Sequence, residues 1–139
     1  MVDSDTTIAE LKEIVKKYCE ERDWDQYHNP KDLAIGVITE ASELLEPFRF
    51  KSEKQMEVML KDSKKRREIS EEMADVLYFT LRSAQKYDID LSDAFHRKME
   101  QNGKKYPIEK AKGSNKKYNE LWKYVKQKYY LWRSTKTIF

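Results

Sequence analysis

The sequence predicts an all-α protein, a bundle of amphipathic helices. Its 139 residues include only three glycines and three prolines, whereas a β-sandwich or barrel needs turn residues about every 8–12 positions. Three scattered glycines also exclude the glycine-rich phosphate loops of Rossmann and P-loop folds. Charged residues make up 38% of the chain, and apolar residues recur between them at the 3.6-residue spacing of helices.

The first two helices are predicted from apolar stripes and from helix-capping residues. The first is expected over residues 7–21, and its stripe consists of Ile8, Leu11, Ile14, Val15 and Tyr18. The second begins after Asn29, a good N-cap, with Pro30 in its first turn, and Pro47 ends it. The stripe of this second helix consists of Leu33, Val37, Ala41, Leu44 and Leu45.

The remaining helices follow in the order short, long, medium and C-terminal. Ser52 and Gln55 indicate a capping box for a short helix. The longest helix is expected over residues 64–87, and its core-facing residues are Ile69, Met73, Val76, Leu77, Thr80, Leu81 and Ala84. A further helix covers residues 92–105. The break at Gly113 divides the chain into a bundle, residues 1–112, and an aromatic segment, residues 113–139, whose amphipathic helix we expect to pack on the bundle or on a neighbouring subunit.

Charge, cysteine content and hydropathy exclude several classes of protein. The 28 Lys and Arg residues against 25 Asp and Glu give a net charge of +3, which is a weak argument for nucleic-acid binding. A single cysteine, Cys19, excludes a disulfide framework and a thiolate zinc site. No apolar run approaches the roughly 18 residues of a membrane span, and the polar N-terminus is unlike a signal peptide. We therefore expect a cytoplasmic protein without a membrane partner.

Two pairs of carboxylates are the strongest chemical signal in the sequence. Glu40 and Glu43 lie three residues apart beside one apolar stripe, and Glu72 and Asp75 repeat this spacing on the longest helix. If these helices pack together, four acids converge and require protons or cations. Oxygen ligands without His or Cys favour Mg²⁺ or Mn²⁺, and Gly36 is expected to leave room for a ligand. The alternative is that these acids merely solvate the helix margins.

Two further groups of residues each have two interpretations. Lys98, Asn102 and Lys105 share an arc with the apolar stripe of their helix, so they point at the carboxylates or at a bound phosphate chain, or else Lys98 extends along the stripe to water. In the turn before the second helix, Trp24 and His28 could stack on and hydrogen-bond a nucleobase. The alternative is that Trp24 packs at one end of the bundle and His28 caps the turn.

The segments ITEASELLEPF and SEEMADVLYF resemble the MazG-like nucleoside triphosphate pyrophosphohydrolases of the all-α type. The resemblance covers about residues 8–121, and RDWDQYHNPKDL and KMEQNGKKYP resemble the dCTP pyrophosphatase branch in particular. It implies Mg²⁺-dependent hydrolysis of a nucleoside triphosphate between the α and β phosphates, with Mn²⁺ as a possible substitute. It also implies a role in nucleotide-pool housekeeping and a homo-oligomer, either a dimer or a dimer of dimers.

The same resemblance implies roles for individual residues. The metal ligands would be Glu40, Glu43, Glu72 and Asp75. Independently of the resemblance, we hypothesise that Glu43, which lies farther than Glu40 from the apolar stripe, orients the attacking water, and that Lys98 acts with Lys105 to offset charge on the leaving group. The substrate-binding residues would be Trp24, His28, Phe50, Phe79, Lys98, Asn102, Lys105 and Tyr106. The branch commonly has Trp in place of Phe50 and Tyr in place of Phe79, which leaves base and sugar selectivity open.

A function of another class is the alternative. A non-catalytic helical module could bind a partner protein, or a nucleic acid, through the basic and aromatic C-terminal segment. The presence of all four acids favours the enzyme, and nucleic acid is not the expected partner.

Overall fold

The computed structural model describes residues 2–121, and every regular element in that range is helical. The all-α prediction is therefore confirmed for this part of the chain. The chain divides into two compact units, of which the first extends to Leu91 and the second begins at Ser92. None of the helices within residues 2–121 is long and apolar enough to cross a membrane.

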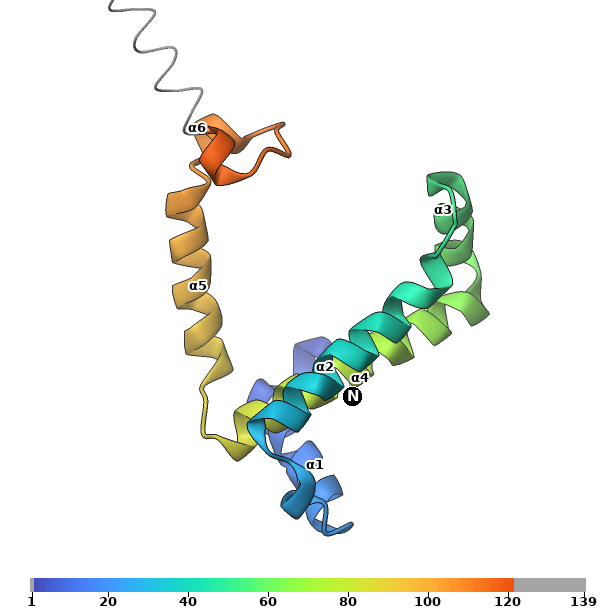
Figure 1. Cartoon of the computed structure of the whole chain (residues 1–139), viewed down its shortest axis with the longest axis vertical. Coiled ribbons are helices and arrows are strands. Elements are labelled where there is room, and N and C mark those ends of the chain that lie inside the picture. Colours follow the sequence, from blue (N-terminus) through green and yellow to red (C-terminus); the bar gives the residue numbers. More distant parts are fainter. Residues whose placement is uncertain (1, 122–139) are drawn as a thin grey trace, which may run out of the picture. The chain divides into compact units, whose positions relative to one another are not determined.

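Four α-helices build the first unit, and α4 is the helix that the other three contact. Their bounds are α1 Ile8–Glu20, α2 Pro30–Leu45, α3 Glu53–Lys61 and α4 Ser63–Lys86. Figure 1 shows α2 and α4 running side by side along much of their length. Three short 3-10 turns, η1, η2 and η3, cover Asp3–Asp5, Asp25–Tyr27 and Glu46–Phe48.

The helices begin where the capping chemistry predicts. Asn29 caps α2 by accepting a hydrogen bond from the backbone N–H of Asp32 at 3.0 Å. Ser52 and its capping box begin α3, as the sequence indicates, and Thr7 forms a second capping box at the start of α1. Each cap satisfies backbone N–H groups that have no partner inside the helix. Local sequence therefore determines where these helices start.

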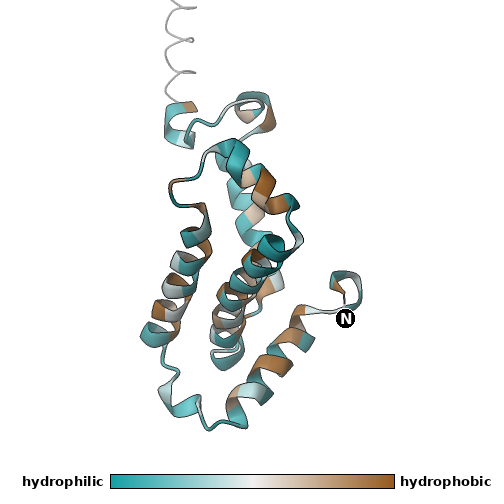
Figure 2. Ribbon diagram, turned by 90° about the vertical axis from the view of Figure 1, so that its right-hand side faces the viewer, coloured by the Kyte–Doolittle hydropathy of each residue, from teal (hydrophilic) through white to brown (hydrophobic). Residues whose placement is uncertain are grey.

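The core of the first unit lies where α1 packs on α4. Val15, Cys19 and Leu81 are buried there, and the partly buried residues packed around them are Leu11, Tyr78 and Leu91. Leu33 of α2 is also fully buried. Figure 2 shows hydrophobic and hydrophilic residues alternating along the helices, as amphipathic helices require. The apolar stripes predict Leu11, Val15, Leu33 and Leu81 of this core, but not Tyr78.

Several residues expected to face the core are exposed instead. Met73 of α4 and Leu45 of α2 are 59% and 60% exposed, and the others are Ile8, Ile14, Tyr18, Ala41 and Leu77. For these residues the prediction of burial is wrong in the single chain. Helical periodicity shows that side chains share an apolar face, but it does not show that another element of the same chain covers that face.

The second unit contains α5, Leu91–Lys105, apart from its first residue, and then α6, Ile108–Ala111. The short helix α6 is absent from the sequence prediction. Residues 118–121 are helical, which agrees with the start of the expected C-terminal helix. The remainder of that helix lies outside the described residues, so its packing and the division of the chain at residue 112 stay predictions.

Candidate active site

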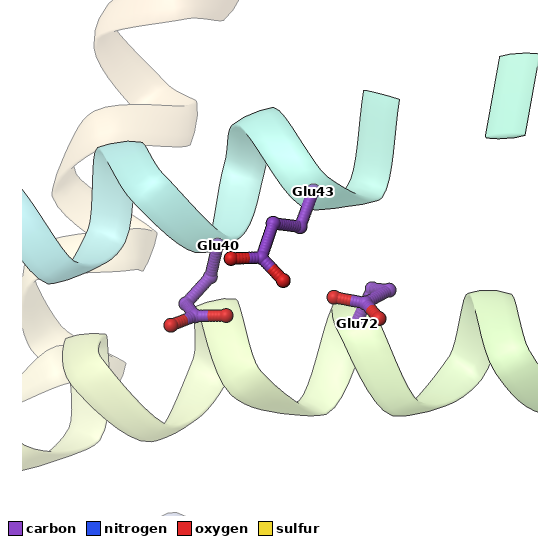
Figure 3. A group of neighbouring side chains, drawn as sticks. All are labelled: Glu40, Glu43 and Glu72. Atoms are coloured by element: carbon purple, nitrogen blue, oxygen red, sulfur yellow. The ribbon is translucent and has the colours of Figure 1, made fainter. Parts of the chain in front are cut away.

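Three of the four predicted acids lie together between α2 and α4. Glu40 and Glu43 of α2 and Glu72 of α4 each offer a carboxylate oxygen within 4.8 Å of the other two. Figure 3 shows the two α2 side chains directed towards α4, with Glu72 facing them. We call this group the three-acid cluster. The i, i+3 spacing on α2 and the close packing of α2 on α4 together produce it.

The electrostatics of the three-acid cluster favour a bound cation. Partial burial raises the pKa of Glu40, and the negative charges of Glu43, Asp75 and Glu72 raise this pKa further. Within residues 2–121, no Lys or Arg side chain forms an ion pair with Glu40, Glu43 or Glu72. Carboxylate oxygens without nitrogen or sulfur ligands fit Mg²⁺ or Mn²⁺.

The fourth predicted acid, Asp75, lies beside the three-acid cluster rather than within it. The negative charge of Asp75 raises the pKa of Glu40, although less than burial and the charge of Glu43 do. Its side chain also lines an adjoining cavity. Its role as a metal ligand stays a prediction.

That adjoining cavity is mostly aromatic. It has a volume of about 310 Å³, and its lining residues are Ile14, Val15, Tyr18, Trp24, Asp75, Tyr78 and Phe79. We call it the aromatic cavity. Its volume lies at the lower end of the range of about 300–1,000 Å³ that is common for ligand pockets. Two predicted substrate-binding residues, Trp24 and Phe79, therefore share a cavity with Asp75.

The space in front of Gly36 is filled by protein. A Cβ atom on Gly36 would lie 2.4 Å from the Cδ1 and Cε1 atoms of Phe79. The expectation that Gly36 leaves room for a ligand is therefore wrong, because the ring of Phe79 occupies that space. A helical wheel gives the direction of a side chain but not the side chain that faces it from another helix.

In the turn before α2, Trp24 packs against the bundle and His28 caps the turn. These contacts are compatible with a further role of both residues in binding a nucleobase. His28 is the C-cap of η2, and its Nδ1 atom accepts a hydrogen bond from Nε of Arg82 at 3.0 Å. The ring of Trp24 contacts Tyr18 edge-on, with a centroid distance of 5.7 Å, and also lines the aromatic cavity. The base-binding role of Trp24 and His28 stays a prediction. Sequence reasoning missed Arg82, which only its place between the buried residues Leu81 and Ala84 could have indicated.

We expect His28 to make the stability of the fold depend on pH. Partial burial lowers the pKa of His28, and the charges of Arg82 and Lys86 lower it further, whereas Asp25 raises it. The unfolded chain therefore binds this proton more readily than the folded chain. We expect the stability contributed by neutral His28 to be complete above about pH 6.5 and to be lost as the pH falls through the lower folded pKa.

Urea unfolding at pH 7.5 and at pH 5.5 measures this effect. The loss of stability on acidification is expected to be larger for the wild type than for His28→Gln, because Gln does not titrate. Identical losses in the two proteins would contradict this assignment.

Phe50 lies away from the aromatic cavity. Its side chain is 93% exposed and its φ of 58° lies in the left-handed region. It borders a separate cavity of about 1060 Å³ that Arg49, Lys51 and Lys54 also line. Phe50 and Trp24 thus line different cavities in the first unit, and the role of Phe50 in binding a base stays a prediction.

The other predicted substrate-binding residues belong to the second unit. Lys98 is exposed on α5, and the backbone N–H of Tyr106 donates to the carbonyl of Asn102 at 2.8 Å. The ring of Tyr118 lies 5.5 Å from Nζ of Lys105 and contacts the Tyr106 ring edge-on. Asn102, Lys105 and Tyr106 therefore lie around the C-terminal end of α5, whereas Lys98 lies in the middle of this helix. Their approach to the acids stays a prediction.

Two helices that bring carboxylates together beside an aromatic cavity define an all-α protein with a candidate centre for a divalent cation. A sequence model of the MazG-like family matches residues 35–121. The chain belongs to the MazG-like family, and the resemblance drawn from its motifs is confirmed.

Relatives in this family are named for pyrophosphatase activity. dCTP pyrophosphatase 1 of Mus musculus is 32% identical over 115 residues, which cover 83% of this chain and 68% of the relative. The Homo sapiens protein of the same name is 31% identical with the same coverage. The crystal structure of a pyrophosphatase from Archaeoglobus fulgidus is similar, with a TM-score of 0.67 and 38% identity, and the match covers 72% of this chain and 92% of that one.

Proposed function

We propose that this protein is a Mg²⁺-dependent nucleoside triphosphate pyrophosphohydrolase that acts on dCTP or a similar pyrimidine deoxynucleotide. It cleaves the bond between the α and β phosphates and releases a nucleoside monophosphate and pyrophosphate, a housekeeping reaction of the nucleotide pool in the cytoplasm. The observation that carries the proposal is the convergence of Glu40, Glu43 and Glu72 within 4.8 Å. The names of the mouse and human relatives support the substrate.

In the proposed chemistry, the acids bind a divalent cation. Glu40, Glu43, Glu72 and Asp75 hold the divalent cation. When bound, Mg²⁺ or Mn²⁺ neutralises phosphate charge and lowers the pKa of a coordinated water.

Glu43 is the proposed orienting base. Its side chain is exposed whereas Glu40 is half-buried, so Glu43 can reach a water in front of the cluster. Glu43 accepts a proton as the water oxygen bonds to the α-phosphorus and the bond to the bridging oxygen breaks. The electrons of the broken bond leave with pyrophosphate. Lys98 and Lys105 offset the negative charge that grows on this leaving group.

The proposed substrate-binding residues surround the nucleoside. Trp24 and Phe79 line the aromatic cavity beside Asp75, which suits a flat base and an apolar sugar face. Phe79 stands where the dCTP pyrophosphatase branch commonly has Tyr, so the substrate panel below decides between ribose and deoxyribose. The further contacts proposed for base, sugar and phosphates come from His28, Phe50, Lys98, Asn102, Lys105 and Tyr106.

A substrate panel tests the proposed function. The protein is incubated with each common ribonucleoside and deoxyribonucleoside triphosphate and Mg²⁺, and pyrophosphate and orthophosphate are measured separately. We expect pyrophosphate from dCTP at the highest rate and no release in excess EDTA. The proposal fails if no triphosphate yields pyrophosphate, or if EDTA leaves the rate unchanged.

The role of Glu43 has its own test. Glu43→Gln preserves the size of the side chain but removes its charge and its ability to accept a proton. We expect kcat with dCTP to fall by about 100-fold at saturating Mg²⁺. The control is Glu57→Gln, an exposed acid of α3 outside the three-acid cluster, which should stay near the wild-type kcat. Full turnover by Glu43→Gln would refute the assignment.

A homo-oligomer, dimer or tetramer, is part of the proposal. Ile35, Ile38 and Leu45 are exposed on one face of α2, and Met73 and Leu77 are exposed on α4. A second copy of the chain would cover these apolar residues, which are costly to leave in water. Light scattering after size exclusion should show an oligomer for the wild type and a smaller species for Ile38→Asp. A wild-type monomer would contradict this part.

A further inference from the structure

The largest fully buried side chain of the described residues is a cation, Arg82 of α4, which is 1% exposed. A buried guanidinium is tolerated only when each of its nitrogen atoms donates a hydrogen bond to an acceptor. Nε of Arg82 donates to Nδ1 of His28 at 3.0 Å. One Nη atom donates to the carboxylate of Asp25, and the other donates to the side-chain oxygen of Gln85. Arg82 therefore connects α4 to both ends of the Asp25–His28 turn.

The last turn of α4 adds two further contacts to the same turn. Nζ of Lys86 lies 3.1 Å from a carboxylate oxygen of Asp25 and donates to the backbone carbonyl of Asp25 at 2.5 Å. The hydroxyl of Tyr87 donates to the backbone carbonyl of His28 at 3.3 Å. Among these groups only Arg82 contacts the side chains of both Asp25 and His28.

The residue that this network holds is Trp24, which directly precedes Asp25 and is the N-cap of η2. The Trp24 ring lies edge-on to His28, with a centroid distance of 6.5 Å, and edge-on to Tyr18. The same ring lines the aromatic cavity together with residues that α4 supplies, Asp75, Tyr78 and Phe79. Arg82 does not itself line this cavity. Any effect of Arg82 on a ligand in the cavity must pass through the turn.

We infer that Arg82 is a positioning residue that holds Trp24 in place as one side of the substrate cavity and thereby sets the affinity for the nucleotide. The inference rests on the proposed function for the identity of the ligand. Arg82 contacts no reacting atom, so its loss should weaken substrate binding and leave the chemical step nearly unchanged.

The geometry requires an arginine in particular. The planar guanidinium reaches His28, Asp25 and Gln85 in three directions at once. Lysine at this position would keep a charge for Asp25, but it has no equivalent of the Nε–H group that His28 accepts. Arg82→Lys should therefore lie between the wild type and Arg82→Met in every measurement.

The position of Trp24 can be measured without catalysis. In a Trp122→Phe/Trp132→Phe background, Trp24 is the only tryptophan, and acrylamide quenching reports its exposure. We expect Arg82→Met to increase the quenching constant at least about twofold, because the restraint on the turn is lost. Arg66→Met, which changes an exposed arginine of the same helix, should leave the quenching constant unchanged. An unchanged constant in Arg82→Met overturns the inference.

Kinetics then test whether the restraint acts on substrate. For dCTP we expect Arg82→Met to raise KM at least about fivefold while kcat stays within about twofold of the wild type. Trp24→Leu should raise KM similarly, and the double variant should be no worse than Trp24→Leu alone. Multiplied effects in the double variant, or a wild-type KM in Arg82→Met, overturn the inference even if Arg82→Met unfolds at lower urea.

Two further variants keep the test decisive if Arg82→Met does not fold. Arg82→Lys retains the charge, and Asp25→Asn removes a partner whose side chain is 61% exposed. Both variants should raise the quenching constant and KM, as expected for Arg82→Met. If the wild type releases no pyrophosphate from any triphosphate, the proposed function fails. The quenching constant then still decides whether Arg82 positions Trp24.

Discussion

Glu72→Gln is expected to lose at least about 100-fold in kcat/KM for dCTP, with a higher Mg²⁺ concentration needed for half-maximal rate. Glu72 is the only member of the three-acid cluster on α4, opposite Glu40 and Glu43 on α2. A cation held between the two helices therefore needs Glu72 to complete its ligands. Pyrophosphate release measured across a Mg²⁺ titration gives both quantities.

The adjacent residue provides the matched control. Glu71 has the same side chain on the same helix, is exposed, and is not part of the three-acid cluster. Glu71→Gln should keep the wild-type rate and the wild-type dependence on Mg²⁺. A loss of similar size in both variants would show that charge on α4, rather than metal coordination, determines the rate.

Stability should change in the opposite direction from activity. The charge of Glu72 helps to raise the pKa of Glu40. Its effect on this pKa is smaller than the effects of burial, Glu43 and Asp75. Removing this charge in the absence of divalent cations relieves repulsion among carboxylates. In EDTA, Glu72→Gln should unfold at a urea concentration no lower than the wild type. Mg²⁺ should stabilise the wild type and have little effect on the variant.

Gly36→Ala is expected to destabilise the protein by about 1–3 kcal/mol. In an open helix this substitution would stabilise by up to about 1 kcal/mol, since alanine is the better helix former. Here the new Cβ atom would lie 2.4 Å from the ring of Phe79, so the packing of α2 on α4 must change. Gly36 lies one turn before Glu40, and Phe79 lies one turn after Asp75. Mg²⁺ affinity should therefore fall together with the free energy of unfolding.

Two comparisons isolate the contact with Phe79. A Cβ atom on Gly103 of α5 would meet no neighbouring atom within 4 Å, so Gly103→Ala should stabilise by up to about 1 kcal/mol. In a Phe79→Ala background the obstructing ring is absent, and Gly36→Ala should no longer destabilise. Urea unfolding measures all of these free energies. A stabilised Gly36→Ala protein with normal Mg²⁺ affinity would disprove the argument.

Local chemistry explains why most of the fold could be predicted from the sequence. Apolar spacing and caps such as Asn29 and Ser52 act within one turn of helix, so the sequence alone contains the necessary information. The meeting of Glu40, Glu43 and Glu72 could also be foreseen, because the pairs have the same spacing on two long helices. The roles of these acids in metal binding and catalysis remain to be tested by the substitutions above.

The features that escaped prediction depend on which elements meet. The sequence suggests open space beside Gly36, but the structure places the ring of Phe79 there. Arg82 reads as an ordinary helix charge until Asp25 and His28 are brought to it from more than fifty residues away. Met73 and Leu77 read as core residues although the first unit leaves them exposed. In each case the missing information was the partner of a side chain rather than its own helix.

The naming of the relatives favours the enzyme over the non-catalytic module. Both mammalian relatives are named dCTP pyrophosphatase 1, and the matched regions include the helices that carry the acids. The module depended on the aromatic C-terminal segment, most of which lies outside the described residues. No observation in residues 2–121 favours that second function.

One helix, α4, carries Glu72, Asp75, Phe79 and Arg82 in succession. At a rise of about 1.5 Å per residue, Glu72 and Phe79 are separated by about 10 Å along the helix axis. If the proposed function is right, this spacing along a stiff helix would orient an elongated ligand, with its anionic end at the cation held by the acids and its ring at Phe79. A molecule whose charged group and ring are separated by a different length would then bind poorly, so α4 alone would select ligands by their length.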